Sequence, residues 1–281
     1  MPTSAELEAI ASQVRRDILR MVHSVQSGHP GGSLGTADFM VALYFQVMKH
    51  RSDHFTMDGI GEDLFFLSNG HLSATWYSVL AHAGYFEKSE LATFRRLNTR
   101  LQGHPTTAEG LPGIRIASGS LGQGLSAGIG AARAKKLNND PNLIYTLHGD
   151  GELQEGQVWE AALYAAGRNI DNIIATIDYN GQQIDGPVDK VLPLGDLEAK
   201  WKAFGWDVLQ MNGNNIADVL STLAIAKSHT GKGKPVVILM HTEMGHGVDF
   251  MLNDYRWHGS PPNDEQLKNA LSQLEETLGD Y

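Results

Sequence analysis

Short apolar runs alternate along the chain with longer amphipathic stretches, and several of the runs end abruptly at Gly, Asp or Asn. Residues 143–147 and 173–177 are two such runs, each made of five aliphatic, aromatic or β-branched residues. Continuous runs of this length are typical of strands that are buried on both faces of a parallel sheet. Between them, residues 155–166 are rich in Ala and are followed by Gly167, which predicts a helix. The pattern therefore predicts a strand–helix–strand unit.

The same patterning continues on both sides of this unit. It predicts further strands at residues 64–67, 206–211 and 236–240. It predicts further helices at residues 4–26, 36–48, 121–136 and 263–278. Alternating strands and helices indicate an α/β fold, with a doubly wound, mostly parallel sheet and helices on both of its faces. No repeat or linker interrupts residues 1–281, so we expect a single domain.

Oxygen-bearing side chains follow two of the predicted strands. Asp150 comes after the strand at residues 143–147, and Asn180 comes after the strand at residues 173–177. In open α/β sheets, ligands bind at the carboxyl ends of the strands. A carboxylate, an amide oxygen and a backbone carbonyl suit Mg²⁺, which completes its coordination with phosphate and water oxygens. The pair therefore favours a Mg²⁺–diphosphate site over a glycine-flanked turn and an Asn cap that bind no ligand.

The net charge and the amino-acid usage exclude several classes of protein. The net charge is −10, which argues against nucleic-acid binding because such binding needs a basic face. No apolar run approaches the roughly 20 residues that span a bilayer, and the N-terminus lacks the pattern of a secretory signal. The chain has no Cys, so it has neither disulfides nor thiolate metal sites. We expect a cytoplasmic protein without nucleic-acid or membrane partners.

Among those of the 12 His residues that lie next to Gly or Pro, four stand out because each lies in a turn predicted to follow a strand or helix. They are His29, His71, His104 and His258. Side chains on such turns contribute to binding and catalytic sites more often than those inside elements do. An imidazole has an unperturbed pKa of about 6.5, so it can accept or donate a proton near neutral pH. These four side chains are therefore candidates for a functional site.

Gly149-Asp150-Gly151 and Asn180, with 28 residues between them, resemble the signature of thiamine-diphosphate enzymes. Seven segments resemble transketolases more specifically: residues 27–30, 69–71, 103–105, 119–125, 149–156, 158–161 and 257–259. They occur in the order of that family, and the resemblance covers about residues 10–275. It implies the thiamine-diphosphate-binding fold of the family's pyrophosphate-binding domain.

The resemblance to transketolases implies a thiamine-diphosphate cofactor with Mg²⁺, or with another divalent cation such as Ca²⁺ or Mn²⁺. The implied metal ligands are Asp150, Asn180 and the backbone carbonyl of Gln182. The implied cofactor contacts are His71, Gly119, Ser120, Leu121, Gly151, Glu155, Asn180 and His258. The residues implied to act on the substrate are His29, His104 and His258. Glu155 matches a carboxylate that is thought to link paired sites, although a solvated residue at the start of a helix would explain it equally well.

The same resemblance implies a site that is divided between two chains. In transketolases, the Glu that activates the cofactor lies in a pyrimidine-binding domain, beyond the part that this chain resembles. The chain therefore resembles the N-terminal subunit of a split transketolase, which is active only with its C-terminal subunit in an expected heterotetramer. The implied reaction moves a two-carbon ketol unit from a ketose to an aldose, with sugar phosphates as the expected substrates.

One position departs from the family pattern. Met244 stands where many transketolases carry a Lys, and His246 is a candidate to replace the lost cation. The usual pentose-phosphate substrates are therefore open to question, and a specialised sugar-degradation transketolase is an alternative. Three rival hypotheses are the α subunit of a 2-oxoacid dehydrogenase (E1), a deoxyxylulose-phosphate synthase and a non-catalytic paralogue that only binds a partner chain.

Overall fold

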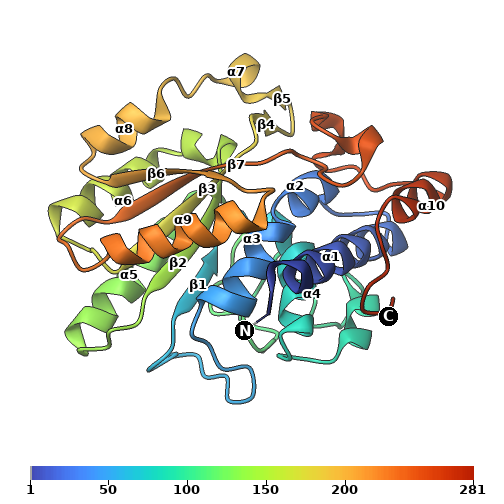
Figure 1. The fold of residues 1–281 in the computed structure, drawn as a ribbon, viewed down its shortest axis with the longest axis horizontal. Coiled ribbons are helices and arrows are strands. Elements are labelled where there is room, and N and C mark those ends of the chain that lie inside the picture. Colours follow the sequence, from blue (N-terminus) through green and yellow to red (C-terminus); the bar gives the residue numbers. More distant parts are fainter. Residues whose placement is uncertain (1) are drawn as a thin grey trace.

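Five parallel strands lie side by side in the computed structural model, which describes residues 2–281 (Figure 1). Their order in the sheet is β1-β2-β3-β7-β6. Their bounds are Leu64–Leu67 (β1), Ile144–Gly149 (β2), Ile173–Tyr179 (β3), Asp207–Asn212 (β6) and Val236–His241 (β7). A separate antiparallel ribbon joins β4 (Gln182–Gln183) to β5 (Gly186–Pro187). All five predicted strands are present, and their predicted parallel pairing is confirmed.

Successive residues of each sheet strand face opposite sides and enter two separate cores. In β2, Ile144 enters one core, while Tyr145 and Leu147 enter the other. In β3, Ile173 lies in the same core as Ile144, and Ile174 lies in the opposite one. Both faces of the sheet are covered, and this explains why the strands form continuous apolar runs in the sequence.

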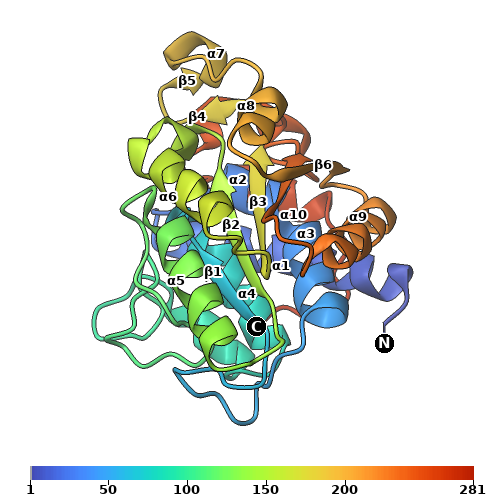
Figure 2. The same cartoon turned by 90° about the vertical axis from the view of Figure 1, so that its left-hand side faces the viewer.

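Helices cover both faces of the sheet, as predicted. One face carries α1 (Ser4–Ser24), α2 (Pro30–Gly35), α3 (Ala37–Ala42), α4 (Ser73–His82) and α9 (Ile216–His229). The other face carries α5 (Gln123–Leu137), α6 (Gly156–Gly167) and α8 (Leu197–Ala203). Figure 2 shows α5 and α6 on one side of the sheet and α3 and α9 on the other. None of the helices within residues 2–281 combines the length and the hydropathy that crossing a bilayer requires.

Shorter helical segments complete the chain. They are α7 (Val188–Val191), α10 (Asp264–Ser272), a π-helical turn at Leu43–Val47, and 3₁₀ turns at Gly70–Leu72, Lys88–Thr93, Gly151–Gln154, Asp249–Met251 and Tyr255–Trp257. Residues 94–122 form neither helix nor strand. This irregular segment is nevertheless packed, because Leu101, Leu111 and Ile114 are buried.

The helix expected at residues 36–48 differs from the observed one. Helical structure begins earlier, at Pro30, and is interrupted at Thr36. A Pro at the first helical position lacks only an N–H group that would have no partner within the helix. This explains how a segment rich in Gly and Pro is helical here. Helices α4, α7, α8 and α9 were not predicted from the sequence.

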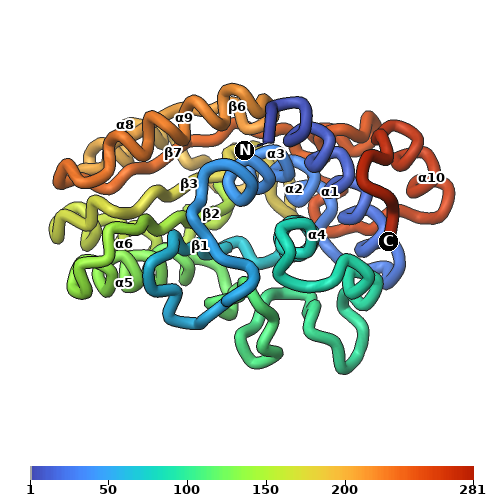
Figure 3. Tube along the Cα trace, turned by 60° about the horizontal axis from the view of Figure 1, so that its bottom comes forward, coloured from blue at the N-terminus to red at the C-terminus, as the bar shows by residue number. Residues whose placement is uncertain are grey.

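The C-terminal helix ends at Ser272 rather than at residue 278. Beyond it, the chain lies against α1 (Figure 3). The side-chain oxygen of Gln13, in α1, accepts hydrogen bonds from the backbone N–H groups of Thr277 and Leu278, each at 3.1 Å. These N–H groups are bonded to a side chain of α1 instead of to a preceding helical turn, so residues 277 and 278 are not helical.

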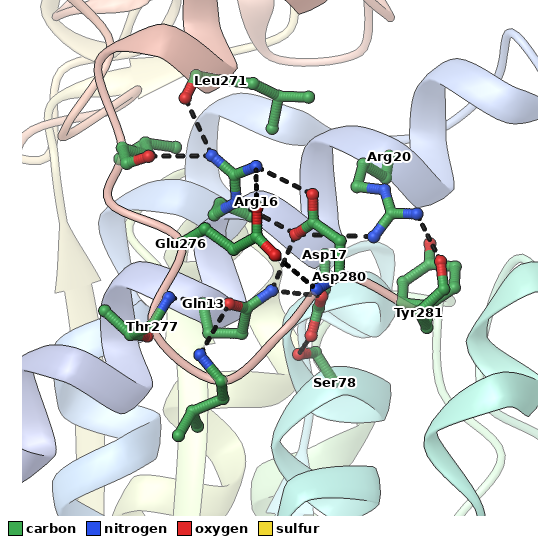
Figure 4. Close-up of polar contacts among 12 residues, drawn as sticks. Gln13, Arg16, Asp17, Arg20, Ser78, Leu271, Glu276, Thr277, Asp280 and Tyr281 are labelled. Atoms are coloured by element: carbon green, nitrogen blue, oxygen red, sulfur yellow. Dashed lines mark hydrogen bonds and ion pairs between the residues drawn. The ribbon is translucent and has the colours of Figure 1, made fainter.

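Arg16 of α1 is the main anchor of this C-terminal segment (Figure 4). Its Nη1 donates to the carbonyl oxygens of Leu271 and Leu274, each at 2.8 Å. Its Nε and Nη2 donate to the Asp280 carboxylate at 3.0 and 2.7 Å. Arg16 is 8% exposed, so water screens these contacts less than it screens a surface ion pair.

We expect Arg16→Met to lower the free energy of unfolding by about 2–4 kcal/mol, because the buried carbonyl of Leu274, the partly buried carbonyl of Leu271 and Asp280 lose their donor. Urea unfolding of the purified chain, followed by circular dichroism, measures this change. Lys232→Met at an exposed position is the control and should change stability by less than about 0.5 kcal/mol. A loss no larger than that of the control would contradict the anchoring role.

Candidate active site

The carboxyl ends of β1, β2 and β3 meet at a cavity of about 410 Å³. Its remaining walls come from α2, the irregular segment before α5, the β4–β5 ribbon and the loops that follow β7. The volume is in the range of small-molecule sites. The cavity also lies at the strand ends where open α/β sheets bind ligands.

The cavity brings together almost all of the residues that were singled out in the sequence. Those that line it are His29, His71, His104, Gly119, Leu121, Asp150, Gly151, Glu155, Asn180, Gln182 and His258. Ser120 does not line it and is exposed. Glu155 lies at the rim, where it is exposed and precedes α6 without a side-chain hydrogen bond to that helix. The link of Glu155 to a paired site stays a prediction.

Asp150 and Asn180 approach the cavity from neighbouring strand ends. The Asp150 carboxylate accepts the backbone N–H groups of Gly151 and Gly181 at 2.7 and 2.6 Å, which fixes its orientation. The side-chain oxygen of Asn180 accepts the backbone N–H of Gln182 at 2.9 Å. The structure therefore places the three proposed metal ligands in one hydrogen-bonded cluster, and their role as ligands stays a prediction.

Asp178 lies beside Asp150 and was not singled out in the sequence. It is 2% exposed, and its oxygens accept the Thr242 hydroxyl and the Nδ2 group of Asn180. Burial raises the pKa of Asp178 to about 6, although the bonds from Thr242 and Asn180 oppose the shift. Burial and the neighbouring Asp178 charge raise the pKa of Asp150 to about 7. Asp178 could have been found in the sequence, because it is a charged residue directly after the apolar run at residues 173–177.

A divalent cation beside Asp150 fits these two carboxyl groups, because it would stabilise their ionised forms. The part of the chain that the structure describes contains no group of three His, Asp or Glu side chains placed to hold a metal. A cation here would depend on Asp150, on amide and carbonyl oxygens, and on oxygens of a bound phosphate. Mg²⁺ accepts this mixed set of ligands.

The four candidate His side chains converge in the cavity. The His29 ring centroid lies 5.0 Å from that of His71, 6.2 Å from that of His104 and 5.5 Å from that of His258. The His71 and His258 rings are 5.2 Å apart. Four segments that are distant in the sequence therefore contribute to one cluster of imidazoles.

The surroundings hold these imidazoles in the neutral form. Burial, with smaller effects of His258, Arg95 and His104, lowers the pKa of His29 to about 4. Burial is also the main cause that lowers the pKa values of His71, His104 and His258. A neutral imidazole has one donor nitrogen and one acceptor nitrogen, which suits proton exchange with substrate hydroxyl groups.

Several buried polar atoms of the cavity wall have no hydrogen-bond partner within residues 2–281. They are Nδ1 of His29, Nδ1 of His258, Oε1 of Gln182, and both side-chain polar atoms of Asn69. Buried polar atoms in native proteins are nearly always paired, so this arrangement indicates a site for a polar ligand. Asn69 is 1% exposed, and the sequence analysis gave it no role, because Asn is common in turns after strands.

The turn at Gly119 packs directly against His104. Gly119 has a φ of +127°, and a Cβ atom there would lie 2.7 Å from the His104 ring. Only Gly allows both this backbone conformation and this close approach. The turn before α5 is therefore held against the His104 loop at the edge of the cavity.

Met244 lines the cavity next to α2 and is 1% exposed. A Cβ atom on Gly31 would lie 2.7 Å from the Met244 side chain, so the two pack tightly. Of the residues from 2 to 281, no Lys or Arg lines the cavity. His246 lines a separate hollow of about 550 Å³ near the ends of β6 and β7, and its ring lies 2.9 Å from Glu243. It therefore does not replace the cation that is missing at Met244.

Comparison with known proteins shows the family to which the chain belongs. Residues 7–277 match the family model described as transketolase, thiamine diphosphate binding domain. The chain belongs to the transketolase family. The resemblance stated from the sequence motifs is confirmed, as is the thiamine-diphosphate-binding α/β fold.

Two relatives match this transketolase chain over nearly their whole length. A 6-deoxy-6-sulfo-D-fructose transketolase subunit of Clostridium sp. (strain MSTE9) is 39% identical over 270 residues, which are 96% of each chain. An apulose-4-phosphate transketolase subunit of Phocaeicola vulgatus is 35% identical over 272 residues, which are 97% of this chain and 95% of the relative. The names of both describe subunits, in agreement with the predicted N-terminal subunit of a split transketolase.

Solved transketolases share the fold of this chain. The structure from Campylobacter jejuni is 32% identical with a TM-score of 0.88, and the match covers 97% of this chain and 43% of the other. The structure from Leishmania mexicana is 29% identical with a TM-score of 0.89, and the match covers 100% and 43%. The chain therefore spans less than half the length of these solved transketolases.

We expect the His29 imidazole to titrate with a midpoint near pH 4, as measured by NMR of labelled His and assigned with His29→Gln. Its folded pKa lies below the unfolded value of about 6.5, so the folded protein binds fewer protons than the unfolded chain between these pH values. His29 should therefore reduce stability as the pH falls from about 6.5 to about 4. A midpoint near 6.5 would contradict the buried, neutral cluster.

Proposed function

We propose that this chain is the N-terminal subunit of a thiamine-diphosphate- and Mg²⁺-dependent transketolase that transfers a two-carbon ketol unit from a ketose to an aldose. The observation that carries the proposal is the convergence of strand-end oxygens and four neutral imidazoles on one cavity. Ca²⁺ or Mn²⁺ would suit the same oxygen ligands.

The strand ends are proposed to hold the anionic end of the cofactor. Asp150, Asn180 and the Gln182 carbonyl would bind the divalent cation that neutralises the diphosphate. The remaining cofactor contacts would come from His71, Gly119, Ser120, Leu121, Gly151, Glu155 and His258. Thiamine diphosphate, when bound, supplies the carbanion chemistry that protein side chains lack.

The imidazoles are proposed to handle the substrate. His29, His104 and His258 would bind the hydroxyl groups of the sugar and would accept or donate protons there. The unpartnered Nδ1 atoms of His29 and His258 support this role, because each is a buried nitrogen that still needs a partner. Burial lowers the pKa values of all three, which keeps a basic nitrogen free near neutral pH.

The activity is proposed to require a second chain. In transketolases, the Glu that activates the aminopyrimidine ring lies in a pyrimidine-binding domain, and this chain matches only 43% of the solved transketolases. We expect the partner to be a C-terminal subunit, in a heterotetramer. The subunit names of the full-length relatives support this arrangement. A cytoplasmic location stays a prediction from the sequence.

The substrate is proposed to be a sugar with an anionic tail. The sugars named for the two relatives carry a sulfo group and a phosphate group, respectively. No Lys or Arg among the described residues lines the cavity, so the partner chain would supply the cations for such a tail. Met244 in place of the usual Lys favours a specialised sugar-degradation transketolase over one for pentose phosphates.

The rival hypotheses make different predictions. Release of carbon dioxide from pyruvate by the assembled complex would favour a 2-oxoacid dehydrogenase or a deoxyxylulose-phosphate synthase. A non-catalytic paralogue is disfavoured, because the strand-end oxygens and the four imidazoles are all in place.

We expect the purified chain to show no ketol transfer alone and to become active when it is co-expressed with the protein encoded next to it. The reason is that the activating Glu would come from the partner. A coupled assay with 6-deoxy-6-sulfofructose, apulose 4-phosphate and xylulose 5-phosphate as donors measures the activity and ranks the substrates. Full activity of the single chain would overturn the divided site.

We expect Asp150→Ala to abolish the Mg²⁺-dependent retention of thiamine diphosphate in the assembled complex, because the cation loses its proposed carboxylate ligand. Gel filtration followed by fluorimetric determination of bound cofactor measures retention. Asp53→Ala, at a side chain that is 75% exposed, is the control and should retain cofactor like the wild type. Mg²⁺-dependent retention in Asp150→Ala would refute the metal assignment.

A further inference from the structure

A buried carboxylate, that of Glu152, lies next to the proposed cofactor contacts and has no role in the function described so far. Glu152 is 2% exposed and belongs to the 3₁₀ turn Gly151–Gln154, directly after Asp150. It also lines the cavity. Burying a carboxylate costs free energy unless hydrogen-bond donors replace its lost hydration. The donors around Glu152 therefore show which segments it connects.

The two oxygens of Glu152 accept hydrogen bonds from three separate segments. Oε1 accepts the backbone N–H of Gly122 at 2.8 Å and the hydroxyl of Ser68. Oε2 accepts the backbone N–H of Gly149 at 3.1 Å. The Nδ1 atom of His148 lies 3.7 Å from Oε1. One carboxylate therefore joins the end of β1, the end of β2 and the start of α5.

Ser68 extends this connection into α5. Its Oγ accepts the backbone N–H of Gly124 at 3.0 Å while its hydroxyl donates to Glu152. The pair thus binds two N–H groups at the start of the helix. Burial opposes ionisation of Glu152, but the contacts of His148, Ser68 and Gly122 outweigh it and lower the pKa of this carboxyl.

We infer that Glu152 is a positioning residue that fixes the distance between two backbone segments proposed to contact the cofactor, an inference that rests on the proposed function. One segment, residues 119–121, directly precedes Gly122. The other segment, Asp150 and Gly151, directly follows Gly149. The same carboxylate binds Gly122 and Gly149, so its loss lets the two segments move relative to each other. A site that loses such support binds its ligand more weakly.

Two substitutions separate the charge from the bulk of the side chain. Glu152→Gln keeps the size, but an amide has one acceptor oxygen and one donor nitrogen. Its nitrogen must face the N–H of either Gly122 or Gly149, and that segment loses its anchor. Ser68→Ala leaves the carboxylate intact and removes only the link to β1 and to Gly124.

Glu62 provides a matched control at the amino end of β1. It is fully buried and accepts the backbone N–H of Arg51 at 3.0 Å and the Nη2 group of Arg115 at 2.7 Å. It does not line the cavity. Glu62→Gln therefore tests the general cost of neutralising a buried carboxylate, without a change in the cofactor segments.

The test is a calorimetric titration of thiamine diphosphate into the reconstituted two-subunit complex at saturating Mg²⁺, followed by donor kcat and KM at saturating cofactor. For Glu152→Gln we expect cofactor binding weaker by about 10- to 100-fold, and for Ser68→Ala weaker by about 3- to 10-fold. The donor KM should stay within about threefold of the wild-type value once the cofactor is saturating. Glu62→Gln should lower the thermal midpoint and keep the wild-type cofactor affinity.

Wild-type cofactor affinity in Glu152→Gln would overturn the positioning role. If that variant does not fold, Ser68→Ala decides, and wild-type affinity in Ser68→Ala would overturn the role instead. An equal loss of affinity in Glu62→Gln would also overturn it, because any buried carboxylate would then have the same effect. Failure of the wild-type complex to bind thiamine diphosphate would refute the proposed function.

Discussion

The close approach of two buried carboxyl groups, those of Asp150 and Asp178, constrains the rest of the site. Parallel pairing places Gly149 opposite Asp178, and the backbone N–H of Asp150 donates to the Asp178 carbonyl at 3.2 Å. The two side chains can therefore not separate without breaking the sheet. The charge of Asp178 raises the pKa of Asp150, and a divalent cation at the proposed site would lower this cost of ionisation. The strand register therefore supports the proposal of a cation at this point.

The neutral imidazoles complement this acidic end of the cavity. Burial removes their charge, and no Lys or Arg of the described chain lines the wall. Positively charged side chains beside the strand ends would compete with a cation for the Asp150 carboxylate and for a diphosphate. In the proposed site, a cation would neutralise the diphosphate, and the four imidazoles would form hydrogen bonds. One cavity can therefore hold an anionic cofactor and an uncharged sugar hydroxyl side by side.

The sheet and the Asp150 turn were predictable because apolar runs and the residues that end them are local signals. Helix α9 has a similar local signal, since Ile216, Val219 and Leu223 recur at helical spacing, but it was not predicted. Helix α2 was not predictable, because Gly and Pro disfavour helix interiors, and the tight packing of Gly31 against Met244 exists only in the folded chain. The role of Glu152 was likewise hidden. Its partners are separated from it by up to 84 residues, and only the folded chain brings them together.

The cavity wall contains buried polar atoms that have no hydrogen-bond partner within residues 2–281, including both polar atoms of the Asn69 side chain. Each such atom lowers the free energy of unfolding by about 1–3 kcal/mol. In a flexible wall, these atoms would turn toward water or toward one another. The hydrogen bonds of Asp150 and Glu152 fix the strand ends and the start of α5 within the folded chain itself. The ordering cost is thus met by folding rather than by binding. A bound diphosphate would then gain hydrogen bonds without having to order the segments that form them.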